Sequence, residues 1–140
     1  MDYQKLVEII TEKVIENLKT NNVKKIRWED ISKSDTSFGG TLKSFSGALD
    51  LDKINIIIGE FEKGEGLKKH YHKYPTEEVY YILEGEVEVT VGSNKIIAKK
   101  GDVLSVKPEV VHWPINKKDE VCKILFILSQ IEESNPIVVE

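Results

Sequence analysis

The chain has a single cysteine, Cys122, and therefore no internal disulfide. Its neighbours are typical of a strand, so we interpret the thiol as a small, half-buried apolar side chain rather than a reactive group. Long apolar runs are also missing: residues 54–59 and 124–128 are far too short to cross a bilayer. The amino terminus lacks the basic-then-apolar profile of a signal peptide. These absences predict a cytoplasmic protein that does not enter a membrane.

An excess of positive charge is absent as well. The formal net charge is −4, with lysines scattered among the acidic residues. Because a nucleic-acid-binding domain presents a basic face, nucleic acid is not an expected partner. The composition, with 40% hydrophobic, 31% charged and 8% aromatic residues, is typical of a globular protein. A chain of 140 residues is long enough to bury one core.

The amino-terminal segment, residues 2–19, is the only convincing helix in the sequence. Its apolar residues recur at helical spacing and form one stripe: Tyr3, Leu6, Val7, Ile10, Val14 and Leu18. Asp2 can cap the start of this helix, and the Asn21-Asn22 pair is a suitable end. We expect the stripe to cover one end or edge of the domain, and the alternative is a helix that binds a partner.

From residue 23 onward the sequence is typical of short β-strands separated by turns. The expected strands span 23–28, part of 41–47, 54–62, 67–72, 77–83, 86–91, 95–99, 102–107, 110–115 and 121–128. The Gly92-Ser93-Asn94 sequence between two of them indicates a hairpin. Short strands at even spacing predict an all-β sandwich or barrel rather than βαβ units.

Two of the three histidines lie one residue apart in the expected strand 67–72. Since successive side chains of a strand point to opposite faces, His70 and His72 share a face with Lys68. About 6–7 Å separates two such positions along a strand, so both imidazoles can converge on one ion. An isolated His-x-His on an exposed strand is more often a surface feature without function.

The following segments add a carboxylate and a third imidazole. Glu78, Tyr80 and Ile82 share one face of the expected strand 77–83, and Glu77 takes the opposite face. His112 again occupies a strand-like position after a turn. Imidazole and carboxylate groups that lie close together can bind a divalent metal.

Residues 64–85 and 101–116 resemble the two sequence motifs of the cupin superfamily. Gly64, His70, His72 and Gly85 match the first motif, Gly-x5-His-x-His-x3–4-Glu-x6-Gly. Gly101, His112 and Asn116 match the second, Gly-x5-Pro-x-Gly-x2-His-x3-Asn. The resemblance covers about half of the chain directly. It implies a double-stranded β-helix, the jelly-roll barrel of cupins, over residues 23–140, preceded by the helix within residues 1–22.

The first motif leaves a choice between two glutamates. Four residues counted forward from His72 lead to Glu77, whereas six residues counted back from Gly85 lead to Glu78. An extra residue fits more readily in the turn at 73–76 than in a strand, where it would reverse every side chain. We therefore expect Glu78 to be the carboxylate of the motif.

The second motif departs from the family pattern at two positions. Lys107 replaces the usual proline, and Glu109 replaces the usual glycine. These replacements put the shape of the turn before His112 in question, but not the histidine itself. Asn116 is expected to tie a turn together, and Trp113 to point away from His112.

By the resemblance, His70, His72, Glu78 and His112 line the barrel interior and bind one divalent metal ion. These four ligands would complete the tetrahedral shell that zinc prefers. Iron, manganese, nickel and cobalt prefer six positions and would keep two for substrate, water or dioxygen. The residues do not decide among these metals.

The resemblance also limits the function. Cupins include dioxygenases, isomerases, epimerases, decarboxylases, lyases and non-catalytic ligand sensors, and a shared fold does not decide among them. The complete ligand set favours a metal-dependent enzyme that acts on a small oxygen-bearing substrate, such as a carboxylate or a sugar. A binding or sensor module without turnover is the competing hypothesis.

Two catalytic candidates follow from the strand faces, together with an expected assembly. Tyr80 could donate a hydrogen bond or act as an acid, and Lys68 could attract an anionic substrate. Simple packing of the tyrosine and a solvent-facing lysine are the alternatives. Small cupins commonly pair, so we expect a homodimer, for which the outward residues Tyr71, Tyr81 and Leu83 would suit the contact surface.

Overall fold

The computed structural model describes residues 2–34, 39–129 and 134–140. In residues 17–21 it describes only the backbone. The side chain of Leu18, which belongs to the predicted stripe, therefore lies outside the described part. The described elements are α1 (Tyr3–Asn21), the 3₁₀ turn η1 (Trp28–Asp30), β1 (Thr41–Ser44), β2 (Ile54–Phe61), β3 (His70–Tyr71), β4 (Glu78–Glu84), β5 (Glu86–Val91), β6 (Asn94–Lys99), β7 (Val103–Val106), β8 (His112–Ile115), β9 (Cys122–Ser129) and β10 (Ile137–Val138).

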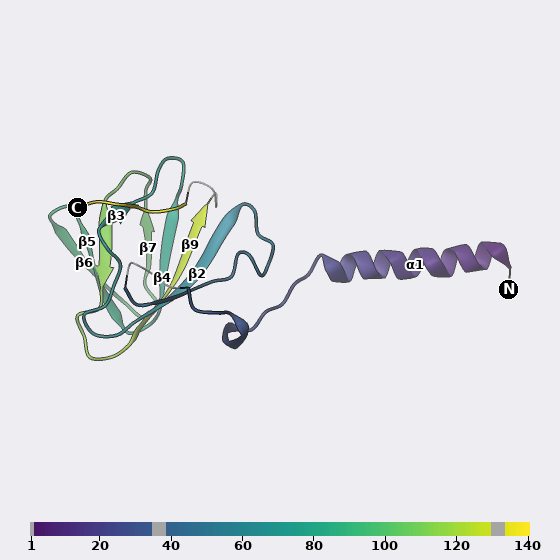
Figure 1. The fold of residues 1–140 in the computed structure, drawn as a ribbon, viewed down its shortest axis with the longest axis horizontal. Helices are drawn as coiled ribbons and strands as arrows, with labels where there is room; N and C mark the ends of the chain where they lie inside the picture. The colour runs from purple at the N-terminus through teal and green to yellow at the C-terminus, as the bar shows by residue number, and fades with distance from the viewer. Residues whose placement is uncertain (1, 35–38, 130–133) are drawn as a thin grey trace.

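The strands form two antiparallel five-stranded sheets, in the orders β1-β2-β9-β4-β7 and β10-β3-β8-β5-β6. The two sheets make opposite walls of a barrel (Figure 1). Apolar side chains from both walls fill its interior: Phe61, Tyr80, Ile82, Val87, Val89, Ala98, Val106, Cys122, Ile124, Phe126 and Leu128. The prediction of an all-β jelly-roll with an amino-terminal helix is therefore confirmed.

Alternation along the strands decides which side chains enter this interior. In β9, buried and half-buried residues alternate over all eight positions, as expected for a strand with one face on a core. In β4 the same alternation turns Glu78, Tyr80 and Ile82 inward. Cys122 is fully buried, and burial raises the pKa of its thiol to about 11, with a smaller contribution from the charge of Glu86. The interpretation of Cys122 as an unreactive packing residue agrees with this environment.

Two parts of the barrel differ from the sequence-based expectation. Residues 23–27 form no strand, and Trp28–Asp30 form a 3₁₀ turn. This segment meets the barrel through side chains instead: the ammonium of Lys43 donates to the Trp28 carbonyl over 3.0 Å and lies 4.2 Å from the Trp28 ring centre. The expected strand 67–72 is shortened to His70–Tyr71, and the strand β10 that pairs with it was not predicted.

The helix α1 does not cover the barrel. Asp2 caps it as predicted, since the Gln4 backbone N–H donates to Asp2 Oδ1 over 3.3 Å. The stripe residues that are described, from Tyr3 to Val14, are 42–80% exposed, and α1 projects away from the barrel (Figure 1). The expectation that the stripe covers an end or edge of the domain is therefore wrong. In the described part of the chain, no helix combines the length and apolar character needed to span a bilayer.

Two glycines allow close approaches between backbone segments of the barrel. Gly85, between β4 and β5, has a φ of +75°, and a Cβ there would lie 2.6 Å from the Val121 carbonyl oxygen. At Gly66, a Cβ would lie 2.0 Å from the Pro114 carbonyl oxygen. That same oxygen accepts a hydrogen bond of 3.0 Å from the N–H of Leu67. The segment before β3 is thereby held against β8.

Candidate metal centre

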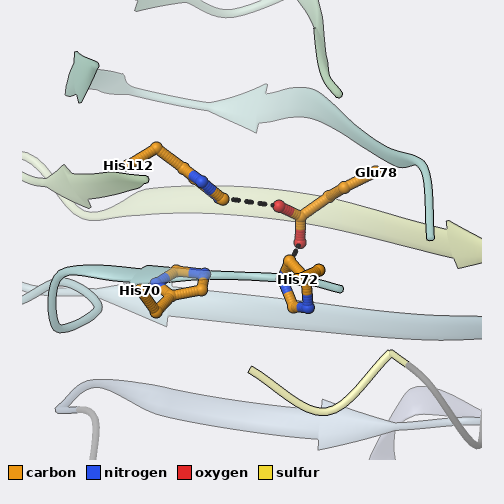
Figure 2. A group of neighbouring side chains, drawn as sticks. All are labelled: His70, His72, Glu78 and His112. Carbon is orange, nitrogen blue, oxygen red and sulfur yellow. Dashed lines mark hydrogen bonds and ion pairs between the residues drawn. The ribbon is translucent and has the colours of Figure 1, made fainter. Parts of the chain in front are cut away.

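Four ionisable side chains from both walls of the barrel meet at one end of its interior (Figure 2). His70 in β3 lies directly opposite His112 in β8 across their ladder. His72 follows β3 immediately, and Glu78 begins β4 in the opposite sheet. Their potential ligand atoms all lie within 4.8 Å of one another. The four residues are only 0–6% exposed.

Each imidazole is oriented by a hydrogen bond from its Nδ1 to a backbone carbonyl. His70 donates to the carbonyl of Lys68 over 2.6 Å, and His112 to that of Val110 over 2.8 Å. His72 donates to the carbonyl of Ser134 over 2.6 Å. Because a carbonyl only accepts, the proton lies on Nδ1 of each ring, and Nε2 is the atom that can ligate a metal.

Glu78 lies between two of these rings. Its Oε1 accepts a hydrogen bond of 2.8 Å from His112 Nε2. Its Oε2 lies 3.3 Å from His72 Nε2, near enough for an ion pair but not aligned as a hydrogen bond. Burial alone would raise the pKa of Glu78, but the hydrogen bond from His112 and the nearby rings of His72 and His112 outweigh burial and lower the pKa to about 2. The carboxyl group is therefore ionised at neutral pH.

His70 is held in its neutral form. Burial and, to a smaller extent, the nearby charge of His112 lower the pKa of His70 from 6.5 to about 4, although the Lys68 carbonyl and Glu78 act to raise it. A neutral imidazole and an ionised carboxylate are the forms in which these side chains bind metal ions. The electrostatics of the site thus keep at least two of the four groups ready for a cation.

The donor set fits one divalent cation. Donor atoms about 2.1 Å from a metal lie at most about 4.2 Å apart, so the 4.8 Å cluster needs only small movements to enclose one. In addition, the buried Nε2 of His72 makes no hydrogen bond within the described part of the chain. A buried nitrogen left in this state costs about 1–3 kcal/mol, and a bound cation would satisfy it. The same cation would displace the proton that joins His112 to Glu78.

The neighbouring Glu77 does not take part in the cluster. Its side chain is exposed and lies 3.7 Å from the ammonium of Lys107. Its backbone N–H donates to Ser129 Oγ over 2.9 Å. The strand register therefore places Glu78, and not Glu77, beside the three histidines.

The two catalytic candidates lie in different environments. Tyr80 is fully buried, its ring centre is 5.9 Å from that of His112, and its hydroxyl has no hydrogen-bond partner in the described residues. Burial and the charge of Glu78 raise the pKa of Tyr80 well above its usual value. The Lys68 side chain is exposed, and the contact that joins this residue to the cluster is its backbone carbonyl.

Glu109 stands where the motif has glycine in the turn before His112. Glu109 occupies the left-handed region with a φ of +68°, which glycine adopts without strain. Its N–H donates to the His72 carbonyl over 2.8 Å, and its Oε1 accepts from the N–H of Tyr74 over 3.0 Å. The glutamate thus connects the loops that carry two of the histidines.

The remaining motif residues support the framework. Asn116 donates to the carbonyls of Phe61 and Glu120 over 2.9 and 2.7 Å, and accepts from the N–H of Lys118 over 2.9 Å. The expectation that Asn116 ties a turn together is therefore confirmed. Trp113 is half-buried next to buried His112, and the Lys69 ammonium lies 5.3 Å from its ring centre.

One group that orients a histidine of the site could not be predicted from the sequence. The Ser134 carbonyl orients His72 from 62 residues away. Every residue carries a carbonyl, so residue type cannot reveal such a contact. Only the path of the chain after β9 places Ser134 beside His72.

Comparison with known proteins agrees with this geometry. The family model described as a cupin domain matches residues 57–128. The chain belongs to the cupin family. This cupin is 41% identical over 61 residues to the uncharacterized protein MJ1618 of Methanocaldococcus jannaschii, covering 43% of this chain and 49% of the relative. It is 35% identical over 57 residues to quercetin 2,3-dioxygenase of Bacillus subtilis, covering 41% of this chain and 17% of the relative. The matched part is thus half or less of each curated relative.

A solved structure extends the likeness to most of the barrel. The polyketide cyclase RemF of Streptomyces resistomycificus superimposes with a TM-score of 0.71, covering 84% of this cupin and 86% of that chain. The two share only 14% sequence identity. At that identity the likeness concerns the fold alone.

Proposed function

We propose that this cupin is a metal-dependent enzyme that binds one divalent cation through His70, His72, Glu78 and His112. Its substrate would be a small oxygen-bearing molecule, such as a carboxylate or a sugar, that reaches the cation. The observation that carries the proposal is the buried cluster of four donors within 4.8 Å. Burying such groups is unfavourable for stability unless they are paired or bind a metal.

The cation would polarise an oxygen of the substrate or lower the pKa of a bound water. The protein itself orients the donors: the carbonyls of Lys68, Val110 and Ser134 hold the rings. Tyr80 is the candidate for direct action on the substrate, because its buried hydroxyl has an unused donor in the described part of the chain. In this role it donates a hydrogen bond to a substrate oxygen. Lys68, exposed beside the site, would attract an anionic substrate as it approaches.

A binding or sensor module without turnover is the second candidate. Its supporting observation is the burial of all four donors, which are at most 6% exposed. A site this enclosed can retain a metal ion firmly without admitting a substrate. The name of one curated relative favours the enzyme, since that protein is a dioxygenase.

The first experiment is metal analysis of protein purified without added metal. Metal-free protein is then loaded with Fe²⁺, Mn²⁺, Ni²⁺, Co²⁺ or Zn²⁺ and incubated with small carboxylates and sugars, and products are followed by NMR. We expect His70→Ala and Glu78→Ala to weaken metal binding by more than a hundredfold, beyond what loss of an outer hydrogen-bond partner causes, and to abolish turnover. Glu77→Ala is the matched control on the same strand and keeps both properties.

Two outcomes would redirect the proposal. If His70→Ala and Glu78→Ala leave metal content and every turnover unchanged, the enzyme proposal is wrong. If a ligand binds the metal-loaded protein and is recovered intact after long incubation, the sensor module takes its place. A homodimer and a cytoplasmic location stay predictions, and a monomeric mass at micromolar concentration would contradict the first of them.

A further inference from the structure

The three histidines of the cluster are oriented in two different ways. His70 and His112 each donate to the carbonyl of the residue two positions earlier, Lys68 and Val110. Both contacts are local, because they depend only on the backbone conformation of three consecutive residues. His72 instead donates to the carbonyl of Ser134, 62 residues later. Its ring orientation therefore depends on a segment that is distant in the sequence.

That segment is the C-terminal strap, residues 134–140. It runs across the barrel toward β3 (Figure 1) and forms the edge strand β10. Ile137 and Val138 pair with Tyr71 and His70, and the N–H of Val139 donates to the Lys69 carbonyl over 2.9 Å. The strap thus lies against the strand that carries two of the candidate ligands. Ser134 itself is only 3% exposed.

His72 needs this support more than the other rings do. It lies just beyond the end of β3, so no ladder bond of the strand holds it. Its backbone is held by the Glu109 N–H, which donates to the His72 carbonyl over 2.8 Å. A backbone bond does not fix the ring about its side-chain torsions. Among the described residues, the hydrogen bond that orients the ring is the one from Nδ1 to the carbonyl of Ser134, and the Nε2 atom lies 3.3 Å from Glu78 Oε2.

We propose that the C-terminal strap is a positioning device that fixes the ring of His72 and thereby sets the metal affinity of the site. The inference rests on the proposed metal binding and goes beyond it, because it concerns a segment that carries no candidate ligand. Outer hydrogen-bond partners of metal-binding histidines typically change metal affinity by 10–100-fold. Because coupling is reciprocal, metal binding must also stabilise the docked strap.

The strap offers a matched pair of substitutions in the full-length chain. Val139→Pro removes the N–H that donates to Lys69. In an antiparallel ladder the N–H groups of successive residues point to opposite sides, so the N–H of Val138 points away from β3, toward the open side of this edge strand. Val138→Pro therefore introduces the same ring without loss of a ladder bond, and an edge strand tolerates it.

The test is titration of both variants with Co²⁺, followed by its visible absorption bands. We expect Val139→Pro to bind Co²⁺ about tenfold to a hundredfold more weakly than the wild type, and Val138→Pro to stay within about twofold. The residual Co²⁺ spectrum of Val139→Pro should approach that of His72→Ala rather than that of His70→Ala. A purely structural role of the strap would not produce this selective change.

Hydrogen exchange of the wild type gives an independent measurement that needs no variant. We expect saturating Co²⁺ to slow exchange in the peptide that contains residues 137–139, measured by mass spectrometry. Equal Co²⁺ affinities of the two proline variants and the wild type would overturn the role of the strap and leave metal binding intact. If Val139→Pro does not fold, unchanged exchange in the wild type overturns it. Absence of Co²⁺ binding in the wild type would overturn both proposals.

Discussion

The two ends of the barrel interior are built from the same strands but have opposite chemistry. Along the inward face of β4, Glu78, Tyr80 and Ile82 follow one another at 4%, 0% and 0% exposure. At the Glu78 end the interior holds three imidazoles and a carboxylate. At the other end Ile82 lies opposite Ile124 of β9 in an apolar core.

Within this one strand, the apolar end contributes to the stability of the barrel, whereas the polar end contributes to the candidate site. A fully buried isoleucine contributes about 1.5–3 kcal/mol to folding, so the apolar end holds the barrel together. Buried polar groups are unfavourable unless they are paired, and Nε2 of His72 and the hydroxyl of Tyr80 lack hydrogen bonds in the described residues. The polar end therefore adds less to stability than the apolar end, and the proposed metal binding would account for its composition.

Substitution at the apolar end should have the largest effect on stability. We expect Ile82→Ala to lower the free energy of unfolding by about 2–5 kcal/mol, because it leaves a cavity in a closely packed core. Metal affinity should be unchanged, since the cluster lies at the other end. Urea unfolding and Co²⁺ titration measure the two properties. Val103→Ala, at a 60% exposed position of β7, is the control and should change stability by less than about 0.5 kcal/mol. A parallel loss of metal binding would mean that the two ends are not independent.

The polar end should make the metal-free protein sensitive to acid. Between pH 6.5 and about 4, the unfolded chain binds a proton at His70 that the folded chain does not. The same holds for Glu78 between pH 4.5 and about 2. Since the unfolded state binds more protons in both windows, stability is retained above pH 6.5 and falls as the pH decreases, by up to about 1.4 kcal/mol per pH unit for each proton.

Urea unfolding of metal-free protein from pH 3 to pH 8 measures this dependence. His70→Gln is the control, and its stability should fall less steeply between pH 6.5 and pH 4. A wild-type stability that stays constant over this range would show that the cluster does not resist protonation.

Tyr80 lies between the two ends and should respond in opposite directions in two assays. Tyr80→Phe removes a buried hydroxyl that has no partner in the described residues, so we expect the metal-free protein to gain about 1 kcal/mol of stability. If the hydroxyl donates to the substrate, turnover should fall at the same time. Tyr81→Phe, at the next and 39% exposed position, is the control for both measurements. A loss of stability in Tyr80→Phe would mean that the hydroxyl is already hydrogen-bonded in the folded protein.

Most of the barrel could be predicted because its signals are local. Alternation in residues 86–91 and the hairpin at Gly92 place β5 and β6 without knowledge of the fold. The choice of Glu78 over Glu77 followed from the motif spacing counted back from Gly85 and from strand register, and the structure places Glu78 in the cluster. Where side-chain alternation and turn chemistry agree, a single sequence specifies both the strand and the face.

The features that were missed depend on contacts between distant segments. Residues 23–27 have the composition of a strand, but no neighbouring strand pairs with them. The strand β10 has only two residues and exists because β3 lies beside it. The apolar stripe of α1 predicted a helix correctly, but periodicity does not say which surface a helix meets. The orientation of His72 by Ser134 belongs to the same class of non-local contacts.

One turn at each end of the barrel gives the smallest and most specific test of the comparison. Gly85 at the apolar end and Glu109 at the polar end both adopt a left-handed conformation, with φ values of +75° and +68°. For glutamate this conformation costs about 1–2 kcal/mol, which its hydrogen bond from the Tyr74 N–H partly offsets. We expect Glu109→Ala to lose about 1 kcal/mol of stability, since the strain stays and the bond is lost. Glu109→Gly loses the same bond but relieves the strain, so its free energy of unfolding should be close to that of the wild type. Equal stability of the two variants in urea would mean that the turn is not strained, and that glutamate stands at this glycine position without penalty.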